Sequence, residues 1–336
     1  MKFPNRYHIL KRNLYESGNK KIVPIRYEDR LLIMRWRNEQ MYHLRQQKVL
    51  TETDQNQYFD TIVSKLFDAN QPNQLLFSYL QDDVCIGYGG LVHINWGDKN
   101  AEISFIIDPE FEKEYFQQHW TTYLSLIEQV AFEGLDLRKI YTYAFDLRPH
   151  LYKAVEAAGF EKEAELKEHF LHYAEYKSVV IHSKINPIGI RPVTIDDLAL
   201  IFEWSNDELT RANSFQQEPI LFDAHCDWFT MRLKDKCKHS FICTFRDEPA
   251  AFLRLDQQDD HAIIGINIAP KFRGEGLSSV FLKKAHQTIS NLIPDIKIRA
   301  LIKDQNTPSI KCFERAGYRL ISNTVVEGVK TLIYQL

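Results

Sequence analysis

Residues 262–277 read AIIGINIAPKFRGEGL, and this stretch decides the fold of the C-terminal half of the chain. Its first part, residues 262–268, is apolar and rich in isoleucine, which predicts a buried strand. A loop with one arginine and two glycines follows, and apolar residues then recur at helical spacing from Leu277 onward. The sequence therefore predicts a strand that leads through a glycine-containing loop into the N-terminus of a helix.

This loop has the composition of an anion site. Backbone N–H groups at a helix N-terminus are unpaired and carry the positive end of the helix dipole. Gly274 and Gly276 remove side chains that would block an anion's approach, and Arg273 adds a positive charge. The loop is therefore expected to hold a diphosphate, although an ordinary strand–turn–helix with two turn glycines would give the same pattern. It has neither the lysine of a P-loop nor the spacing of a dinucleotide site.

A second stretch, residues 296–318, predicts another strand followed by a short helix. Residues 296–302 are mostly apolar and read as the strand. Asn306 or Thr307 can cap the helix, and Pro308 suits its first turn. Gly317 suits the residue after its C-terminus, so a helix of about ten residues is bounded at both ends.

Together, the two stretches resemble the cofactor motifs of the GCN5-related N-acetyltransferases. Residues 273–278, RGEGLS, are similar to the family's R-x-x-G-x-G/A loop, with Ser278 in the last small position. Residues 306–318 fit N-x-x-S-x-x-x-F-x-x-x-G-Y, which resembles its second motif. The resemblance implies that the loop holds the pyrophosphate of acetyl-CoA and that the helix and its asparagine line the pantetheine arm. It implies cofactor contacts from Ile268, Ala269, Arg273, Gly274, Glu275, Gly276, Leu277, Ser278, Asn306, Ser309 and Phe313.

The chain contains the same organisation twice. Residues 146–159 and 304–317 each span 13 positions from an aspartate to a glycine, and an aromatic residue follows each glycine. A length of 336 residues also favours two domains. The protein is therefore expected to be α/β (α+β), with two tandem acetyltransferase-like folds. Each is expected to be a mixed, mostly antiparallel central sheet flanked by helices.

The first domain is expected over residues 1–185 and the second, which would bind acetyl-CoA, over residues 190–336. An N-terminal hairpin is predicted because residues 7–10 and 21–23 flank the turn signal Ser17-Gly18-Asn19.

The first domain keeps the fold signals but lacks the cofactor signals, which makes it a degenerate copy. Alignment of Pro109 with Pro270 pairs Glu112 with Arg273, Lys113 with Gly274, Tyr115 with Gly276, Arg148 with Asn306 and Leu151 with Ser309. A carboxylate and a phenol ring would then face the diphosphate, so this domain is not expected to bind acetyl-CoA in the usual way. The alternative is that Lys113 and Arg148 supply the anion contacts.

The resemblance implies direct transfer of acetyl from acetyl-CoA to a primary amine in the second domain. Phe313 stands where the family has a tyrosine acid, so that role is left to water or to a weak substitute such as Cys312 or Ser309. Asp260 and His261 are candidates for the base, with a noncatalytic hairpin pair as the alternative, and Glu218 and His225 are further options for the base. Candidate acceptor contacts, which the resemblance to amino-sugar acetyltransferases suggests, are Asn213, Glu218 and His225.

The expected acceptor is a small-molecule amine, first an amino sugar or sugar nucleotide. Protein N-terminal amines and aminoglycosides come next. A noncatalytic scaffold that binds CoA is the rival to an enzyme, and turnover on an amine panel would distinguish the two.

The bulk properties narrow the partners and the compartment. The formal net charge of −3 disfavours nucleic acid and anionic membranes. No run of 18 apolar residues and no secretory h-region is present, so no membrane segment and a cytoplasmic location are expected. The 5 cysteines form no C-x-x-C pair, which indicates reduced thiols and no metal site. The oligomeric state stays open.

Overall fold

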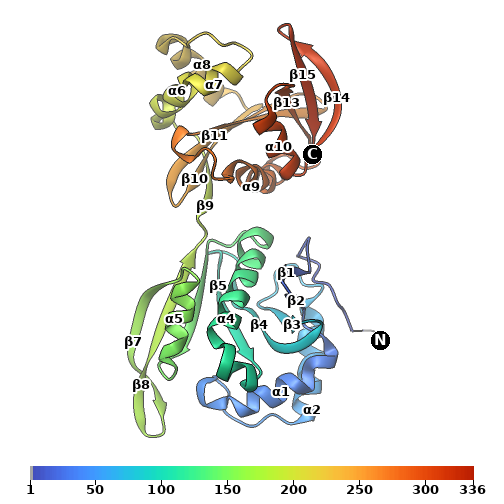
Figure 1. Cartoon of the computed structure of the whole chain (residues 1–336), viewed down its shortest axis with the longest axis vertical. Helices are drawn as coiled ribbons and strands as arrows, with labels where there is room; N and C mark the ends of the chain where they lie inside the picture. The colour runs from blue at the N-terminus through green and yellow to red at the C-terminus, as the bar shows by residue number, and fades with distance from the viewer. Residues whose placement is uncertain (1–2) are drawn as a thin grey trace. The chain divides into compact units, whose positions relative to one another are not determined.

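The computed structural model describes residues 3–336 and divides the chain into two compact units that meet between Asn186 and Pro187 (Figure 1). Each unit has its own hydrophobic core, built on its own sheet. We call them unit 1 and unit 2 and describe each by itself.

Within its described residues, unit 1 has one eight-stranded sheet in the order β1-β2-β3-β4-β5-β6-β8-β7. Only the β5–β6 pair is parallel there. The strands are β1 (Tyr15–Ser17), β2 (Lys20–Pro24), β3 (Leu75–Gln81), β4 (Val84–Asn95), β5 (Asn100–Ile107), β6 (Lys139–Phe145), β7 (Glu161–His172) and β8 (Glu175–Ile185).

The helices of unit 1 pack on this sheet through buried apolar side chains. The long helix α4 follows β5 without a loop, because Asp108 caps it by accepting a hydrogen bond from the Glu110 backbone N–H at 3.0 Å. The helices are η1 (Tyr27–Asp29), α1 (Arg30–Glu39), η2 (Met41–His43), α2 (Glu52–Tyr58), η3 (Phe59–Val63), α3 (Ser64–Leu66), α4 (Pro109–Glu128), η4 (Gln129–Gly134) and α5 (Pro149–Ala157).

Unit 2 has a seven-stranded sheet in the order β14-β15-β13-β12-β11-β10-β9, again with one parallel pair, β12–β13. Its strands are β9 (Ile188–Pro192), β10 (Lys238–Phe245), β11 (Glu248–Gln257), β12 (His261–Ile268), β13 (Lys297–Lys303), β14 (Arg319–Val326) and β15 (Val329–Gln335). Its helices are η5 (Ile195–Asp197), α6 (Leu198–Asn206), α7 (Glu208–Asn213), α8 (Phe222–Lys234), η6 (Pro270–Phe272), α9 (Leu277–Leu292) and α10 (Thr307–Arg315).

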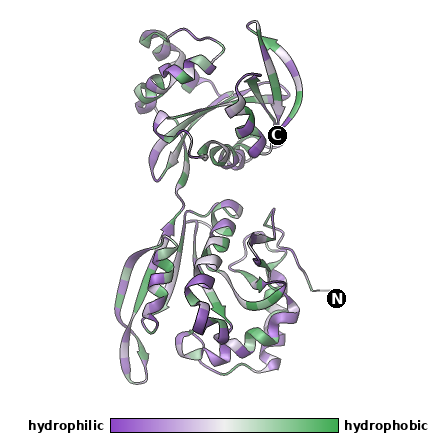
Figure 2. Ribbon diagram, in the orientation of Figure 1, coloured by the Kyte–Doolittle hydropathy of each residue, from purple (hydrophilic) through white to green (hydrophobic). Residues whose placement is uncertain are grey.

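The helix after the glycine loop is amphipathic, as its sequence spacing predicts. Phe281, Leu282, Ala285 and Ile289 of α9 are fully buried, whereas Val280 on its other side is 40% exposed. Figure 2 shows hydrophilic and hydrophobic residues mixed along the helices of both units. Burial of one apolar face on the sheet therefore fixes the direction in which α9 leaves the loop.

The parallel strands diverge in both units, and this divergence positions the pockets. In unit 2, β12 and β13 pair only from His261 to Ile263. In unit 1, β5 and β6 pair only from Asn100 to Ile103. Beyond these residues the backbone groups that face the gap are free of the ladder, so each sheet has an opening that side chains or a ligand must fill.

The predicted fold class, two mixed and mostly antiparallel sheets flanked by helices, is confirmed. The N-terminal hairpin exists, but its first strand is Tyr15–Ser17 and not residues 7–10. Tyr7 and Leu10 are instead fully buried in the core, where the Tyr7 hydroxyl donates to the Leu76 carbonyl at 2.7 Å. Residues 7–10 are therefore apolar because they are buried in the core, and not because they form a strand of the hairpin.

Candidate functional site

A pocket of about 890 Å³ lies in unit 2 at the opening between β12 and β13. The strand β11, the helices α7 and α8, the glycine loop and the start of α10 complete its walls. Seven of the predicted cofactor contacts line it: Ile268, Arg273, Gly274, Ser278, Asn306, Ser309 and Phe313. The structure thus brings the two separate sequence motifs to one cavity.

The glycine loop is shaped for an anion. Gly274 and Gly276 have φ values of 84° and 75°, a left-handed conformation that favours glycine. A Cβ built on either one would meet no protein atom within 4 Å, so the space above the loop is open. Gly276 is the N-cap of the 16-residue helix α9 and has no side chain to cap its N–H groups. Those donors and the helix dipole therefore face open space, which fits a phosphate group.

The sequence alone suggested that the Arg273 side chain extends freely toward this space. In the structure it does not, because other residues of unit 2 hold it. Its Nη2 lies 2.7 Å from Asp207 Oδ2 and donates to Thr210 Oγ1 at 3.1 Å, and its Nε donates to the Ile268 carbonyl at 3.2 Å. The hydrogen bond from Arg273 holds the pKa of Asp207 below its usual range. Arg273 therefore braces the start of α7 against the loop.

The start of α10 forms another part of the cavity wall. Asn306 caps the helix, since its Oδ1 accepts from the Ser309 backbone N–H at 3.2 Å, and Gly317 follows the helix at φ 101°. Both features match the predicted boundaries. Phe313 is buried edge-on against Tyr318, with ring centroids 4.9 Å apart.

Cys312 also lines the pocket, and burial raises the pKa of its thiol to about 11. The thiol is therefore protonated at neutral pH.

Four predicted cofactor residues do not line the cavity. Ala269 and Leu277 are buried in the core beneath the loop, and Glu275 and Gly276 are exposed at its outer side. Glu275, Gly276 and Leu277 belong to the loop and the first turn of α9, so only their backbone N–H groups could reach a ligand there. The Ala269 N–H is not available, because it donates to the Ala250 carbonyl at 2.9 Å.

The predicted base pair lies away from the cavity. Asp260 and His261 bond to each other, Oδ1 to Nδ1, at 2.7 Å, where β12 begins. Asp260 is 70% exposed, and neither residue is among those that line the pocket, whose wall on β12 begins at Ile264. The noncatalytic alternative for this pair therefore fits the geometry, because a base must reach the reacting amine.

Of the three predicted acceptor contacts, Asn213 and His225 line the cavity and Glu218 does not. His225 is buried among the rings of Phe202, Trp228 and Phe229. Burial lowers its pKa, so the imidazole is neutral at pH 7. Its Nε2 has no hydrogen-bond partner among the described residues.

Sequence reasoning missed two arginines in the cavity wall, Arg211 and Arg254. Arg211 donates to the Gln216 carbonyl at 3.2 Å and to Ser214 Oγ at 3.0 Å, which are neutral groups. Arg254 lies over Gly265, its partner on β12, where a Cβ would stand 3.0 Å from Arg254 Nε.

In the described part of the chain, neither guanidinium has a carboxylate partner, and Glu327 is the one acidic residue of the wall. The sequence offered a sign of the position of Arg254. An arginine that pairs with a glycine on the neighbouring strand has room to lie across the sheet.

Unit 1 has no such loop. Because α4 begins at Pro109, helix occupies the positions that align with the glycine loop, and Tyr115 interrupts it with φ −124° and ψ 22°. Glu112 and Arg148, which align with Arg273 and Asn306, form an ion pair at 2.9 Å with both side chains mostly buried. Arg148 is therefore not free to replace the lost anion contacts, and Lys113 is exposed on α4.

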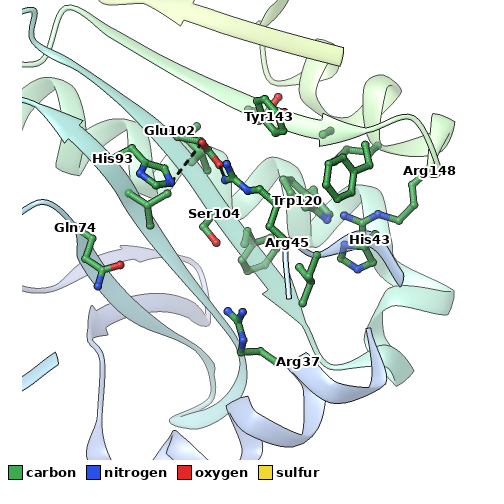
Figure 3. Close-up of a pocket in the computed structure, with 18 of the residues that line it drawn as sticks. Arg37, His43, Arg45, Gln74, His93, Glu102, Ser104, Trp120, Tyr143 and Arg148 are labelled. Atoms are coloured by element: carbon green, nitrogen blue, oxygen red, sulfur yellow. Dashed lines mark hydrogen bonds and ion pairs between the residues drawn. The ribbon is translucent and has the colours of Figure 1, made fainter. Parts of the chain in front are cut away.

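A smaller cavity of about 490 Å³ remains in unit 1 at the opening between β5 and β6 (Figure 3).

Two further observations concern residues 3–336 as a whole. No group of three or more histidine, cysteine, aspartate or glutamate side chains is placed to hold a metal ion. No helix there has the length and apolarity that crossing a membrane requires.

The family follows from comparison with known proteins. Residues 22–177 and residues 188–319 each match a family model described as an acetyltransferase (GNAT) domain. The chain therefore belongs to the GNAT acetyltransferases, an acyltransferase family, and carries two such domains in tandem. A comparison with curated protein sequences gave no significant match.

Solved structures with a similar fold match about half of the chain. One is a spermidine N-acetyltransferase from Vibrio cholerae in complex with CoA and spermine, at 20% identity and a TM-score of 0.44, covering 51% of this chain and 97% of that one. A dodecameric structure of spermidine N-acetyltransferase from the same organism is 20% identical, with a TM-score of 0.42, and the match covers 51% of this chain and 95% of that one. A domain from Methanocaldococcus jannaschii is 23% identical, with a TM-score of 0.40, and the match covers 44% of this chain and 97% of that one.

Proposed function

We propose that unit 2 transfers the acetyl group of acetyl-CoA to the primary amine of an amino sugar or a sugar nucleotide. The observation that carries the proposal is the open glycine loop at the N-terminus of α9, joined to a cavity of about 890 Å³ in the same sheet opening. An anion cradle next to a cavity of this size suits a long cosubstrate with a diphosphate at one end.

The residues present fit acetyl-CoA. The N–H groups of the loop and the first turn of α9 would hold the diphosphate, with Ser278 at its edge. Asn306, Ser309 and Phe313 would line the pantetheine arm. When bound, the cosubstrate supplies the acetyl group and a thiolate leaving group.

We assign the proton transfers to water in the cavity. His225 is neutral at pH 7, but its Nε2 is buried, so it can act as a base only after the rings around it move. The Cys312 thiol lies beside Ser278, at the diphosphate end of the proposed cosubstrate, and is therefore far from the leaving thiolate. The Asp260–His261 pair lies outside the cavity.

Arg211 and Arg254 support an acceptor that carries negative charge. Guanidinium groups bind phosphates and carboxylates well, and the wall offers one exposed acid, Glu327, against them. A polyamine or an aminoglycoside would bring several positive charges into the field of two unpaired arginines, which opposes binding. An amino sugar that bears phosphate, such as a sugar nucleotide, fits better.

A charge placed beside the loop tests the cosubstrate site. Ser278→Glu should weaken CoA binding about tenfold or more, since like charges a few Å apart oppose binding by about 1–4 kcal/mol. Val280→Glu is the matched control, because Val280 is 40% exposed on the same turn of α9 and outside the cavity. Both acids lie near a helix N-terminus and should not destabilise the fold.

Calorimetric titration with CoA measures the difference in CoA affinity between the two variants. If the native chain shows neither heat of binding nor a shift in melting temperature with CoA, the cosubstrate assignment is overturned. Free-thiol release with acetyl-CoA and an amine panel then separates an enzyme from a noncatalytic CoA-binding scaffold.

The acceptor class is tested by turnover. The panel consists of glucosamine, glucosamine 6-phosphate, a UDP-linked amino sugar and spermidine. The number of negative charges rises across the first three compounds, whereas spermidine is a polycation. Arg254→Gln should raise KM for the phosphorylated acceptors about tenfold or more, since one charge-assisted hydrogen bond is lost. It should change KM for glucosamine little. Arg319→Gln, on the exposed strand β14, is the control. Preference for spermidine in the native protein would overturn the acceptor assignment.

A further inference from the structure

The cavity of unit 1 lies at the sheet opening equivalent to that of unit 2, and its wall has its own set of charges. It measures about 490 Å³, within the range of about 300–1,000 Å³ that small-molecule sites occupy. Figure 3 shows labelled side chains around it from α1, η2, the segment after η2, β4, β5, α4 and β6. The aromatic and apolar side chains of Phe105, Trp120 and Leu151 form part of its wall.

One cation in this wall has no anionic partner. The Arg37 guanidinium donates from Nε to Gln46 Oε1 at 2.9 Å and from Nη1 to the Tyr88 hydroxyl at 2.5 Å, which are neutral groups. Among residues 3–186, no carboxylate lies within ion-pair distance of it. A guanidinium keeps its charge at every physiological pH, and a charge removed from water is costly without a partner.

The other cations of the wall are already neutralised. Arg148 pairs with Glu112 at 2.9 Å, and Arg45 pairs with Glu102. Burial lowers the pKa of His43 to about 3, so that imidazole is uncharged. The cavity therefore carries one net positive charge, and it comes from Arg37.

The opposite side of the cavity presents a buried acceptor. Glu102, on β5, is 5% exposed, with its carboxylate directed into the space that Figure 3 shows between Arg45 and His93. Arg45, which lies over the Tyr143 ring at 4.8 Å, and His93 are 48% and 65% exposed at the rim. The partners of Glu102 are thus exposed side chains, whereas Glu102 itself is fixed in the sheet.

We propose that the cavity of unit 1 binds a small organic carboxylate that carries hydrogen-bond donors, amine or hydroxyl, away from its acid group. Arg37 pairs with the acid, and Glu102 accepts from the donors across the cavity. Phe105 and Trp120 contact the carbon frame between them. Unit 1 is then a ligand-binding domain. It lacks the anion-binding loop of an acetyltransferase but has the same opening in its sheet, lined by different side chains.

Three other occupants fit less well. Acetyl-CoA lacks a cradle here, because helix α4 starts at Pro109 and the Glu112–Arg148 pair occupies the aligned positions. A polyamine would meet the unpaired charge of Arg37. A neutral sugar would satisfy Glu102 and leave Arg37 without an anion.

A panel of amino acids, hydroxy acids and sugar acids, each beside its primary amide, tests this on the full chain. Binding is read by calorimetry and by tryptophan fluorescence, since Trp120 lines the cavity. At least one acid should bind, about tenfold or more tighter than its amide, because a charge-assisted pair is lost in the amide.

Arg37→Gln should remove that preference and Arg37→Lys should keep part of it, whereas Arg35→Gln, 58% exposed on the same helix, should leave it unchanged. Glu102→Gln should weaken binding of acids that carry an amine.

Three results would overturn the proposal: no acid of the panel binds, the amides bind as well as the acids, or Arg37→Gln behaves like Arg35→Gln. Ser278→Glu, which acts on unit 2, should leave this binding intact. The outcome is therefore independent of whether unit 2 uses acetyl-CoA.

Discussion

The ion pair between Asp207 and Arg273 shows how a single residue can serve fold and site at once. Asp207 caps α7 by accepting from the Thr210 backbone N–H at 3.0 Å, and it also holds Arg273 at 2.7 Å. Asparagine can keep the cap but not the ion pair. Asp207→Asn should therefore lower the free energy of unfolding of unit 2 at pH 7 by about 0.5–1 kcal/mol, because both side chains are only partly buried.

This contribution has a defined pH dependence. Arg273 lowers the pKa of Asp207 in the folded state, so the stabilisation is complete above the unfolded value of about 4 and is lost as pH falls through the folded pKa. Urea unfolding at pH 7 and at about pH 3 should show that the difference in stability between the two proteins is smaller at the lower pH. A constant difference between them, or an equal effect of Asp259→Asn in the exposed loop before β12, would contradict the assignment.

The residues that sequence reasoning placed correctly are those whose roles are local. Gly274 and Gly276 were identified from a loop between a strand and a helix, and their left-handed φ values agree with that role. Arg273 was found for the same reason, but its partner Asp207 is 66 positions earlier, and no local pattern links the two. The Asp260–His261 pair does not line the cavity, because pocket position depends on where the sheet opens and no local pattern reports that.

At the scale of an element, α10 combines a structural cap with a wall of the proposed cosubstrate site. Asn306 Oδ1 accepts from the Ser309 N–H, and Asn306 also lines the cavity. Asn306→Ala should cost about 1 kcal/mol through the lost cap. Asn306→Asp should keep the stability, since aspartate caps as well, but should raise KM for acetyl-CoA because the amide donors are gone and a negative charge is added.

Urea unfolding and initial rates with acetyl-CoA as the varied substrate separate these two effects. Leu151, which aligns with Ser309 in the degenerate copy, offers a comparison: it is 3% exposed in the core of unit 1, where it contributes an apolar side chain to the wall of the smaller cavity. If Asn306→Asp loses as much stability as Asn306→Ala, the cap is not the source of the effect.

Elements with strong periodicity or clear boundaries were predictable, and the pairing between them was not. The strand over residues 262–268 and the helix after it match β12 and α9 within a residue or two. The short stretch over which β12 pairs with β13 is invisible in the sequence of either strand, because divergence depends on what packs between them. That divergence creates both cavities, so the missed arginines and the unit 1 pocket have the same origin.

At the scale of the whole molecule, two separate cores predict two unfolding events. The buried clusters of unit 1 and unit 2 share no residue, so the chain should not unfold in one step. CoA at about 100 times its Kd should stabilise only the unit that binds it, by about 2.7 kcal/mol. Calorimetry of the full chain should therefore show two transitions, of which CoA raises one.

The transitions can be assigned with matched core variants. Leu124→Ala in unit 1 and Leu282→Ala in unit 2 each remove a fully buried leucine side chain, and each should lower its own transition through a loss of about 2–5 kcal/mol. CoA should still raise the transition that Leu282→Ala lowers, and Ser278→Glu should reduce that shift to about half or less. A carboxylate that occupies the unit 1 cavity should raise the other transition alone. If CoA raised the transition that Leu124→Ala lowers, the degenerate copy would be the cosubstrate site, and the roles of the glycine loop and of the Glu112–Arg148 pair would have to be exchanged.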